Sequence, residues 1–118
     1  LPQVTLLPVP DAVKFSFRMS EDERRSEAQR YQDLLKLISR TARGCFLLVL
    51  DEACAAVNTG LLPLEDLLAC LDSLECEVVL TGRDPAPELM ERADYITSME
   101  AVRHPFEQGI TAREGIEF

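Results

Sequence analysis

The sequence predicts an α/β fold, with a mainly parallel sheet flanked by helices, in a single domain over residues 1–118. Two observations support this fold class. Helix-like segments alternate along the chain with short apolar segments, as in folds built from β-α-β units. One apolar segment, Cys45 to Leu50, shows no alternation of polar and apolar residues. Such a run is typical of a strand that is buried on both faces in a parallel sheet.

The first part of the chain is predicted to hold an extended run and one long helix. Val4 to Val9 favours β structure, and residues 14–19 follow as an extended segment or loop. Ser20 and Glu23 form a capping box, in which the serine hydroxyl accepts from the third helical amide. The helix that they start extends over residues 21–42, with an apolar stripe at helical spacing, and a glycine follows it.

The second part of the chain is predicted to alternate strands and helices. In chain order the pattern indicates strand 45–50, helix 53–57, turn 58–60, helix 64–74, strand 77–81, helix 87–93 and strand 95–99. Residues 103–118 have no clear period.

Composition and charge limit the classes of function. Twelve basic and 21 acidic side chains give a net charge of −9. A nucleic-acid partner is disfavoured, because phosphate binding needs clustered positive charge. The densest basic group, Arg24, Arg25 and Arg30, lies among acidic residues and is typical of a solvated helix face with paired charges. No apolar run approaches the roughly 20 residues of a membrane helix. We therefore expect a cytoplasmic protein with neither a nucleic-acid nor a membrane partner.

The four cysteines are predicted to be reduced and structural. They form no C-x-x-C pair, and with one histidine in the chain a zinc site is disfavoured. Cys45 lies in an apolar run and Cys70 in a leucine-rich helix, so both are expected to be small buried hydrophobic residues.

The ends of two predicted strands carry candidate ligand-binding residues, since ligands of parallel α/β sheets bind beyond the carboxyl ends of the strands. Asp51 and Glu52 follow the first apolar strand. An acidic pair in this position resembles a Walker B element, whose carboxylates hold Mg²⁺. The alternative is that the pair only starts a loop or caps a helix. Thr81 and Arg83 end the second strand and offer a hydroxyl and a planar guanidinium suited to phosphate. The alternative there is a plain turn with an exposed arginine.

The C-terminal segment carries three more candidates for contact with a polyphosphate. They are Arg103, His104 and Arg113. Two alternatives remain open: the histidine is structural, or the glycine-rich segment is a strap packed across the sheet.

One motif of nucleotide-binding proteins is missing from the sequence. A P-loop requires G-x-x-x-x-G-K-[ST], and the two lysines, Lys14 and Lys36, follow Val13 and Leu35. The sequence therefore contains no Gly-Lys pair and no phosphate-cradling loop of this type.

Four stretches together resemble one family, the ATP:corrinoid adenosyltransferases built on a P-loop fold. The stretches are KFSFRM (14–19), VLDEACAAVNTGLL (49–62), VVLTGRDPAPELMERADYIT (78–97) and VRHPFEQGITAREGIEF (102–118). They follow the order and spacing of the family over nearly the whole chain, and the VLTGR element combined with the C-terminal ending is highly specific.

The resemblance implies transfer of the 5′-deoxyadenosyl group of ATP to the Co(I) of a corrinoid, with release of triphosphate, in cobalamin biosynthesis or salvage. It implies ATP with Mg²⁺ or Mn²⁺, the corrinoid as substrate, a reductase as electron donor to cobalt, and a homodimer. It also implies that Phe15 and Phe17 pack beneath the corrinoid and help to remove its lower axial ligand. The alternative is that both are core residues.

The resemblance assigns further residues and leaves one part unmatched. Asp51 and Glu52 match the acidic pair near the metal and the triphosphate, and Arg83 matches the arginine of the T-G-R turn. The family's first strand and P-loop have no counterpart, so residues 1–118 correspond to the C-terminal two-thirds of a P-loop NTPase-like (RecA-like) domain. This loss should leave sheet edges unpaired and apolar surface facing water. We expect the chain alone to be inactive. The alternative is a non-catalytic homologue that acts as a corrinoid-binding or interaction protein.

Overall fold

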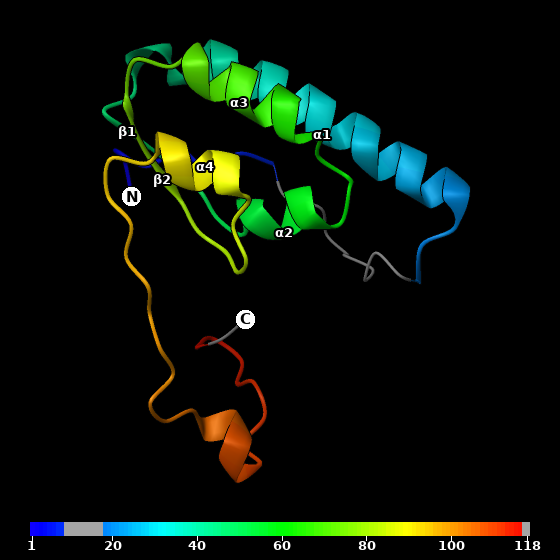
Figure 1. Cartoon of the computed structure of the whole chain (residues 1–118), viewed down its shortest axis with the longest axis vertical. Coiled ribbons are helices and arrows are strands. Elements are labelled where there is room, and N and C mark those ends of the chain that lie inside the picture. The colour runs from blue at the N-terminus through cyan, green and yellow to red at the C-terminus, as the bar shows by residue number, and fades with distance from the viewer. Residues whose placement is uncertain (9–17, 117–118) are drawn as a thin grey trace.

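Two parallel strands and the helices packed against them form the body of the protein (Figure 1). The structure, a computed structural model, describes residues 1–8 and 18–116. The elements in chain order are α1 (Glu21–Thr41), η2 (Ala42–Gly44), β1 (Leu47–Leu50), α2 (Ala53–Asn58), α3 (Leu64–Asp72), β2 (Glu77–Leu80), α4 (Pro87–Arg92) and η3 (Pro105–Gln108). The predicted α/β class with a parallel sheet is therefore confirmed.

Helix α1 begins where the sequence predicts. The Ser20 hydroxyl accepts a hydrogen bond from the Glu23 amide at 3.1 Å, which is one half of the predicted capping box. The helix ends at Thr41, and the last predicted residue, Ala42, starts the short η2 helix. Along the exposed face, Arg25 and Arg30 pair with acidic residues one turn away, at 3.7 and 2.7 Å. The predicted solvated face with paired charges is thus confirmed for Arg25 and Arg30, whereas the third arginine of the group, Arg24, is half-buried and donates to the Thr59 carbonyl at 2.9 Å.

Strands β1 and β2 pair in parallel, with Leu47 opposite Glu77 and Leu50 opposite Leu80. Hydrogen bonds continue beyond both ends, from the Glu77 amide to the Phe46 carbonyl at 3.1 Å and from the Thr81 amide to the Leu50 carbonyl at 3.2 Å. The two strands consequently end side by side at the same edge of the sheet.

Helices cover only one face of this sheet. Leu48, Leu50 and Leu80 point into the apolar clusters formed with the helices. On the opposite face, Val49 and Val79 remain 55% and 43% exposed. The expectation that β1 is buried on both faces is therefore wrong. The helices pack on the face that carries Leu48 and Leu50 and leave the face that carries Val49 uncovered. The expectation of apolar sheet surface facing water is confirmed.

The core sits between the sheet and helices α1 and α3. Leu67 of α3 is only 1% exposed and belongs to a cluster with Ala56, Leu62 and Leu89. A second cluster joins residues of α1, η2 and α3: Ile38, Ala42 and Cys70. The predicted burial of Cys70 is thus confirmed. Cys45 is exposed, contrary to expectation, because it lies in the connection between η2 and β1 and not within the strand. All four cysteines are free thiols, as predicted.

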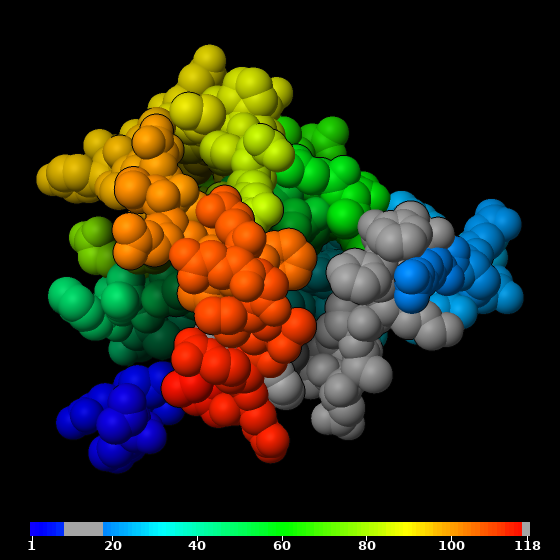
Figure 2. Space-filling model, turned by 90° about the horizontal axis from the view of Figure 1, so that it is seen from below, coloured from blue at the N-terminus to red at the C-terminus, as the bar shows by residue number. Residues whose placement is uncertain are grey.

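The C-terminal segment leaves the body of the protein after α4. The predicted strand over 95–99 is wrong: these residues form no strand, and Tyr95 is 93% exposed. A β-prone sequence forms a strand only where it finds a paired neighbour, and here the segment extends away from β1 and β2 (Figure 1). Seen from below, the C-terminal part of the chain stands in front of the body (Figure 2). Residues 4–8 of the predicted N-terminal β run also form no strand, and the rest of that run lies outside the described residues.

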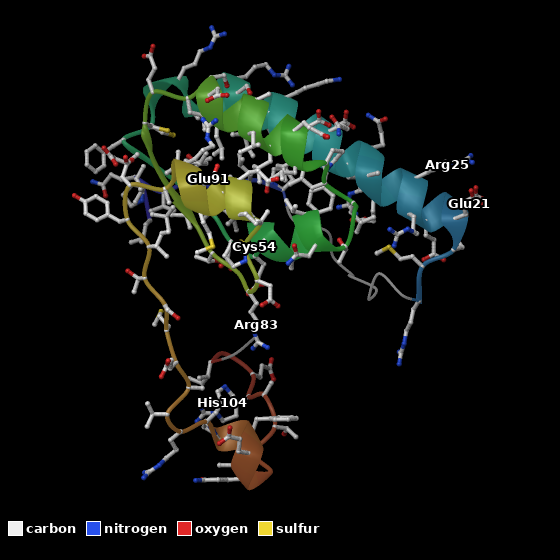
Figure 3. The ribbon with its side chains drawn as sticks, viewed as in Figure 1. Glu21, Arg25, Cys54, Arg83, Glu91 and His104 are labelled. Carbon is white, nitrogen blue, oxygen red and sulfur yellow. The ribbon has the colours of Figure 1, made fainter. Side chains whose placement is uncertain are left out.

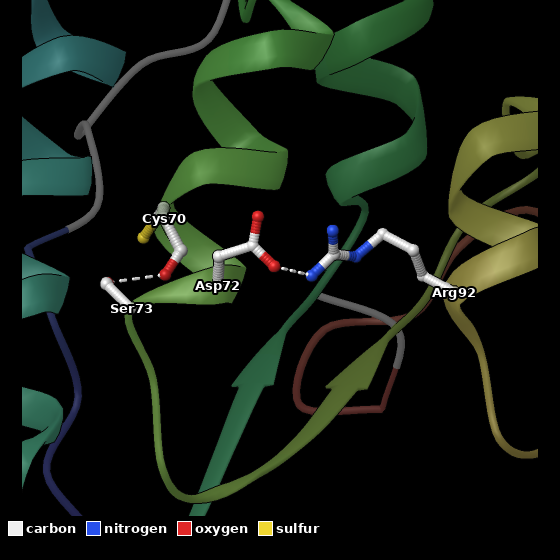
Figure 4. A network of polar contacts seen from close by, with 4 residues as sticks. All are labelled: Cys70, Asp72, Ser73 and Arg92. Atoms are coloured by element: carbon white, nitrogen blue, oxygen red, sulfur yellow. Dashed lines mark hydrogen bonds and ion pairs between the residues drawn. The ribbon is translucent and has the colours of Figure 1, made fainter.

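An ion pair joins the ends of α3 and α4. The Arg92 guanidinium donates to the Asp72 carboxylate, next to a local hydrogen bond from the Ser73 hydroxyl to the Cys70 carbonyl at 2.6 Å (Figure 4). The hydrogen bond from Arg92 lowers the pKa of the Asp72 carboxyl below its ordinary value of 3.8.

The described helices also differ from a membrane span. None of them is long and apolar enough to cross a membrane.

We predict that Leu67→Ala lowers the free energy of unfolding by about 2–5 kcal/mol, since it removes buried apolar contacts and leaves a cavity at the centre of the core. Urea unfolding measures the change. Tyr95→Ala, which truncates a side chain that is almost fully exposed, should change the free energy by less than about 0.5 kcal/mol. Equal effects of the two substitutions would contradict this description of the core.

A second prediction concerns the pH dependence of the ion pair. A carboxyl whose pKa is lowered on folding stabilises the folded state above its ordinary pKa, and the stabilisation is lost as the pH falls through the folded value. Arg92→Gln should therefore lower the urea midpoint slightly at pH 7, and this difference should vanish as the pH falls below 3.8 and Asp72 is protonated. Arg43→Gln, at an exposed arginine outside this pair, is the control for loss of a positive charge. A difference that persists in acid would contradict the assignment.

Candidate active site

The carboxyl ends of β1 and β2 bring the two sequence-predicted polar groups together. Asp51 and Thr81 follow the paired residues Leu50 and Leu80, so they stand opposite each other at the sheet edge. The Thr81 hydroxyl donates to Asp51 Oδ1 at 2.6 Å. The candidate carboxylate of Asp51 and the candidate hydroxyl of Thr81 are thus joined by a direct hydrogen bond, although 30 residues separate them in the sequence.

Thr81 also fixes the chain that follows β1. Its hydroxyl oxygen accepts from the Glu52 amide at 3.0 Å, and its carbonyl accepts from the Cys54 amide at 3.4 Å. The hydroxyl hydrogen is therefore engaged with Asp51 in this structure. This hydrogen bond uses only Oδ1 of Asp51. The other carboxylate oxygen, Oδ2, takes no part in it, and Asp51 is exposed.

Glu52 occupies an unusual backbone conformation at this edge. Its φ is 55°, in the left-handed region, where a residue other than glycine is strained. The residue is the N-cap of α2, yet its side chain makes no capping hydrogen bond. The alternative in which the Glu52 carboxylate serves as a helix cap is therefore not supported, and this carboxylate stays exposed beside Asp51.

The turn after β2 passes very close to α2. Gly82 has a φ of 142°, and a Cβ at this position would lie 2.6 Å from the Cys54 Cβ. Burial raises the pKa of the Cys54 thiol above its usual range, and the Glu52 carboxylate adds to the increase, while a backbone hydrogen bond opposes it. A thiol with a raised pKa is a poor nucleophile at neutral pH, so Cys54 is a packing residue that holds the turn against α2.

Arg83 is exposed and extends from this turn away from the helices, toward the side of the molecule where His104 lies (Figure 3). The backbone of the turn is held by Asn58, whose Nδ2 donates to the Arg83 carbonyl at 3.3 Å and to the Asp84 carbonyl at 3.0 Å. The sequence predicts only a turn around Asn58 and misses this contact. No local signal indicates it, because the bonded groups are 25 and 26 residues away.

The three C-terminal candidates lie on the exposed segment beyond α4. Arg103, His104 and Arg113 are all exposed, and the His104 Nδ1 accepts from the Phe106 amide at 3.1 Å at the start of η3. Residues 101–116 are exposed throughout, so the alternative of a strap packed across the sheet is not observed. A structural role for His104, as the cap of η3, is observed.

Asp51 and Glu52 are chemically suited to Mg²⁺ but do not form a complete site. Within residues 1–8 and 18–116, no three His, Cys, Asp or Glu side chains gather closely enough to hold a metal ion. Mg²⁺ characteristically binds through one or two carboxylates, with waters and substrate phosphates as the other ligands. The two carboxylates fit that pattern. The predicted corrinoid contacts, Phe15 and Phe17, lie outside the described residues.

We predict that Gly82→Ala lowers the free energy of unfolding by about 1–3 kcal/mol more than Gly60→Ala, because the new methyl group must displace Cys54. Gly60 is a matched control: its φ is also positive, at 77°, but the nearest atom to an added Cβ is 3.8 Å away. Urea unfolding of both variants separates steric overlap from backbone strain. Similar losses would show that the turn is not packed on Cys54.

The sequence matches a protein-family model along nearly its whole length, and individual known proteins over 61–77% of it. The model of the family described as "ATP:corrinoid adenosyltransferase BtuR/CobO/CobP" matches residues 5–118. A Pseudomonas aeruginosa protein named corrinoid adenosyltransferase is 42% identical over 74 residues, which are 61% of this chain and 36% of that protein.

Two further relatives carry related names. A corrinoid adenosyltransferase from Sinorhizobium is 34% identical over 94 residues, covering 77% of this chain and 44% of the relative. The Salmonella typhimurium protein named corrinoid adenosyltransferase CobA is 31% identical over 74 residues, covering 61% and 38%. The chain thus spans less than half the length of these curated relatives. Because the family match takes in almost every residue of the sequence, the chain belongs to the ATP:corrinoid adenosyltransferase family.

Proposed function

We propose that this chain forms the metal-side part of a transferase that moves the 5′-deoxyadenosyl group of ATP to the Co(I) of a corrinoid and releases triphosphate. One observation carries the proposal: two parallel strands place Asp51 and Glu52 beside Thr81 and Arg83 at a single edge, with the Thr81 hydroxyl bonded to Asp51. Family membership and the names of the relatives support it. The parallel pair with an acidic edge is also the arrangement expected for part of a P-loop NTPase-like sheet.

The proposed reaction requires stabilisation of a highly charged leaving group. The cobalt electron pair attacks C5′ of ATP, the C5′–O bond breaks, and the electrons of that bond leave on the triphosphate. Mg²⁺ or Mn²⁺, when bound, supplies positive charge to the phosphate oxygens. Asp51 and Glu52 would hold the ion, with the Thr81 hydroxyl fixing the orientation of Asp51. Arg83 offers a guanidinium fork to the same phosphates.

Two further groups of candidate residues lie outside this edge, and only the first, Phe15 and Phe17, takes its role from the family resemblance. Phe15 and Phe17 are proposed to lie beneath the corrinoid and to exclude a lower axial ligand from cobalt. Arg103, His104 and Arg113 are proposed to contact the nucleotide phosphates when the exposed C-terminal segment lies against them. A reductase that supplies electrons to cobalt, a homodimer, and a cytoplasmic location complete the proposal. A second copy is one way to cover the open face of the sheet.

The alternative function is a non-catalytic one, and it concerns the 118 residues of this sequence. No Gly-Lys pair exists in the 118 residues, so the chain contains no loop of the P-loop type to hold the β- and γ-phosphates. A protein that binds a corrinoid through Phe15 and Phe17 without catalysing transfer is therefore the alternative.

We predict that the 118-residue chain alone forms no adenosylcobalamin from ATP, Mg²⁺ and reduced cobalamin, since this loop is missing. Absorbance spectroscopy follows the cobalt alkylation, with the Pseudomonas aeruginosa relative as the positive control. Fusion of a segment that carries the family's first strand and P-loop ahead of residue 5 should restore turnover, and Glu52→Gln should lower it at least about tenfold in the fusion. Turnover by the chain alone would contradict the prediction. A fusion that binds cob(II)alamin but never turns over would favour the non-catalytic alternative.

A further inference from the structure

The side-chain amide of Asn58 bridges two segments at the candidate site. Asn58 is the last residue of α2, and its Nδ2 donates to the carbonyls of Arg83 and Asp84 at 3.3 and 3.0 Å. An amide nitrogen has two hydrogens, which is enough for both bonds. The acceptors belong to the turn that carries the candidate phosphate ligand.

The hydrogen bonds of the Asn58 side-chain amide reach out of its own helix and do not cap it. The C-cap of α2 is Thr59, whose hydroxyl donates to the Ala56 carbonyl at 3.0 Å. The Thr59 carbonyl in turn accepts from Arg24 of α1 at 2.9 Å, which fixes the end of α2 to the longest helix. Asn58 therefore projects from an anchored position, and the two carbonyls that accept from its Nδ2 both lie in the distant turn.

The backbone has positive φ on both sides of Arg83, and it is strained at Asp84, which is not a glycine. Gly82 has a φ of 142°, and Asp84 has a φ of 49°, in the left-handed region. A residue other than glycine is disfavoured in that region, although Asp and Asn adopt it more readily than others, and strained conformations persist only where the surroundings determine them. Cys54 packs against the turn before Arg83, and Asn58 holds the carbonyls of Arg83 itself and of the next residue.

We propose that Asn58 is a positioning residue, which fixes the Arg83–Asp84 backbone so that the Arg83 guanidinium is presented to the phosphate chain at the carboxyl edge of β1 and β2. The proposal rests on the proposed function, since it assigns Arg83 to phosphate binding. Asn58 itself does not contact the phosphates. Its effect on binding passes entirely through Arg83, and this separates positioning from a general contribution to stability.

The experiment is a double-mutant cycle on the full 118-residue chain, with Mg²⁺ and inorganic tripolyphosphate as the probe. The variants are Asn58→Ala, Arg83→Ala and both together. NMR chemical shifts of the Asp51, Glu52 and Arg83 amides follow binding, and heteronuclear NOE values of the Arg83 and Asp84 amides report the order of the turn. Asn58→Ala should weaken binding about three- to tenfold, as expected for two hydrogen bonds to neutral carbonyls. It should cause no further loss in the Arg83→Ala background.

Two matched variants control for folding and size. Asn58→Asp keeps the shape of the side chain but cannot donate to the carbonyls, so it should lower the NOE values of the turn at least as much as Asn58→Ala does. Its added negative charge changes the phosphate affinity as well, so the affinities are compared through Asn58→Ala. Gln29→Ala removes a side-chain amide that donates to Asp33 on α1, and it should leave both binding and the turn unchanged. Urea unfolding verifies that each variant is folded under the conditions of the titration.

The outcomes separate this proposal from the proposed function. The positioning role is overturned if Asn58→Ala and Asn58→Asp leave the NOE values unchanged and Asn58→Ala leaves the affinity unchanged, or if Asn58→Ala weakens binding equally with and without Arg83. The wild-type chain could instead bind no tripolyphosphate while Asn58→Ala still disorders the turn. That result would contradict phosphate binding at this edge, and it would support the positioning of the Arg83–Asp84 backbone by Asn58.

Discussion

The candidate site depends on the parallel register of β1 and β2. Because Leu50 pairs with Leu80, Asp51 and Thr81 emerge opposite each other, and a hydroxyl-to-carboxylate bond of 2.6 Å joins them. A slip of one residue would turn Thr81 to the other face of its strand and break this bond. The same hydroxyl also holds the Glu52 amide. One pairing register therefore positions both acidic residues and the start of the turn that carries Arg83.

Local signals in the sequence predict most helices and strands well. The hydroxyl of Ser20 marks the start of α1, and the apolar runs before Asp51 and Thr81 mark β1 and β2. Two expectations fail for reasons that are not local. Val49 is exposed because covering of a strand depends on which other segments pack on it. The Tyr95 segment has the composition of a strand, but strand formation also needs a neighbour, which residues 95–99 do not meet.

The candidate site is predictable in its residues but not in its connections. Position at a strand end identifies Asp51, Glu52 and Thr81, because the carboxyl ends of parallel strands share one edge. That Thr81 bonds Asp51, and that Asn58 holds the turn, could not be predicted from patterns, since each contact spans 25 residues or more. Side-chain hydrogen bonds of this kind are set by the relative placement of α2 and the sheet, which only tertiary packing determines.

Electrostatics at this edge account for the cation requirement of the proposed function. Asp51, Glu52 and Asp84 all lie at or next to the edge and outnumber the single guanidinium of Arg83. The whole chain is also acidic, with a net charge of −9. A polyphosphate would therefore be repelled unless a divalent cation stands between it and the carboxylates. The same carboxylates that repel the bare anion attract the cation, so metal and phosphate should bind together and neither should bind tightly alone. In the proposed function, the hydrogen bond from Thr81 to Asp51 would keep one carboxylate directed toward the cation of a metal–phosphate complex.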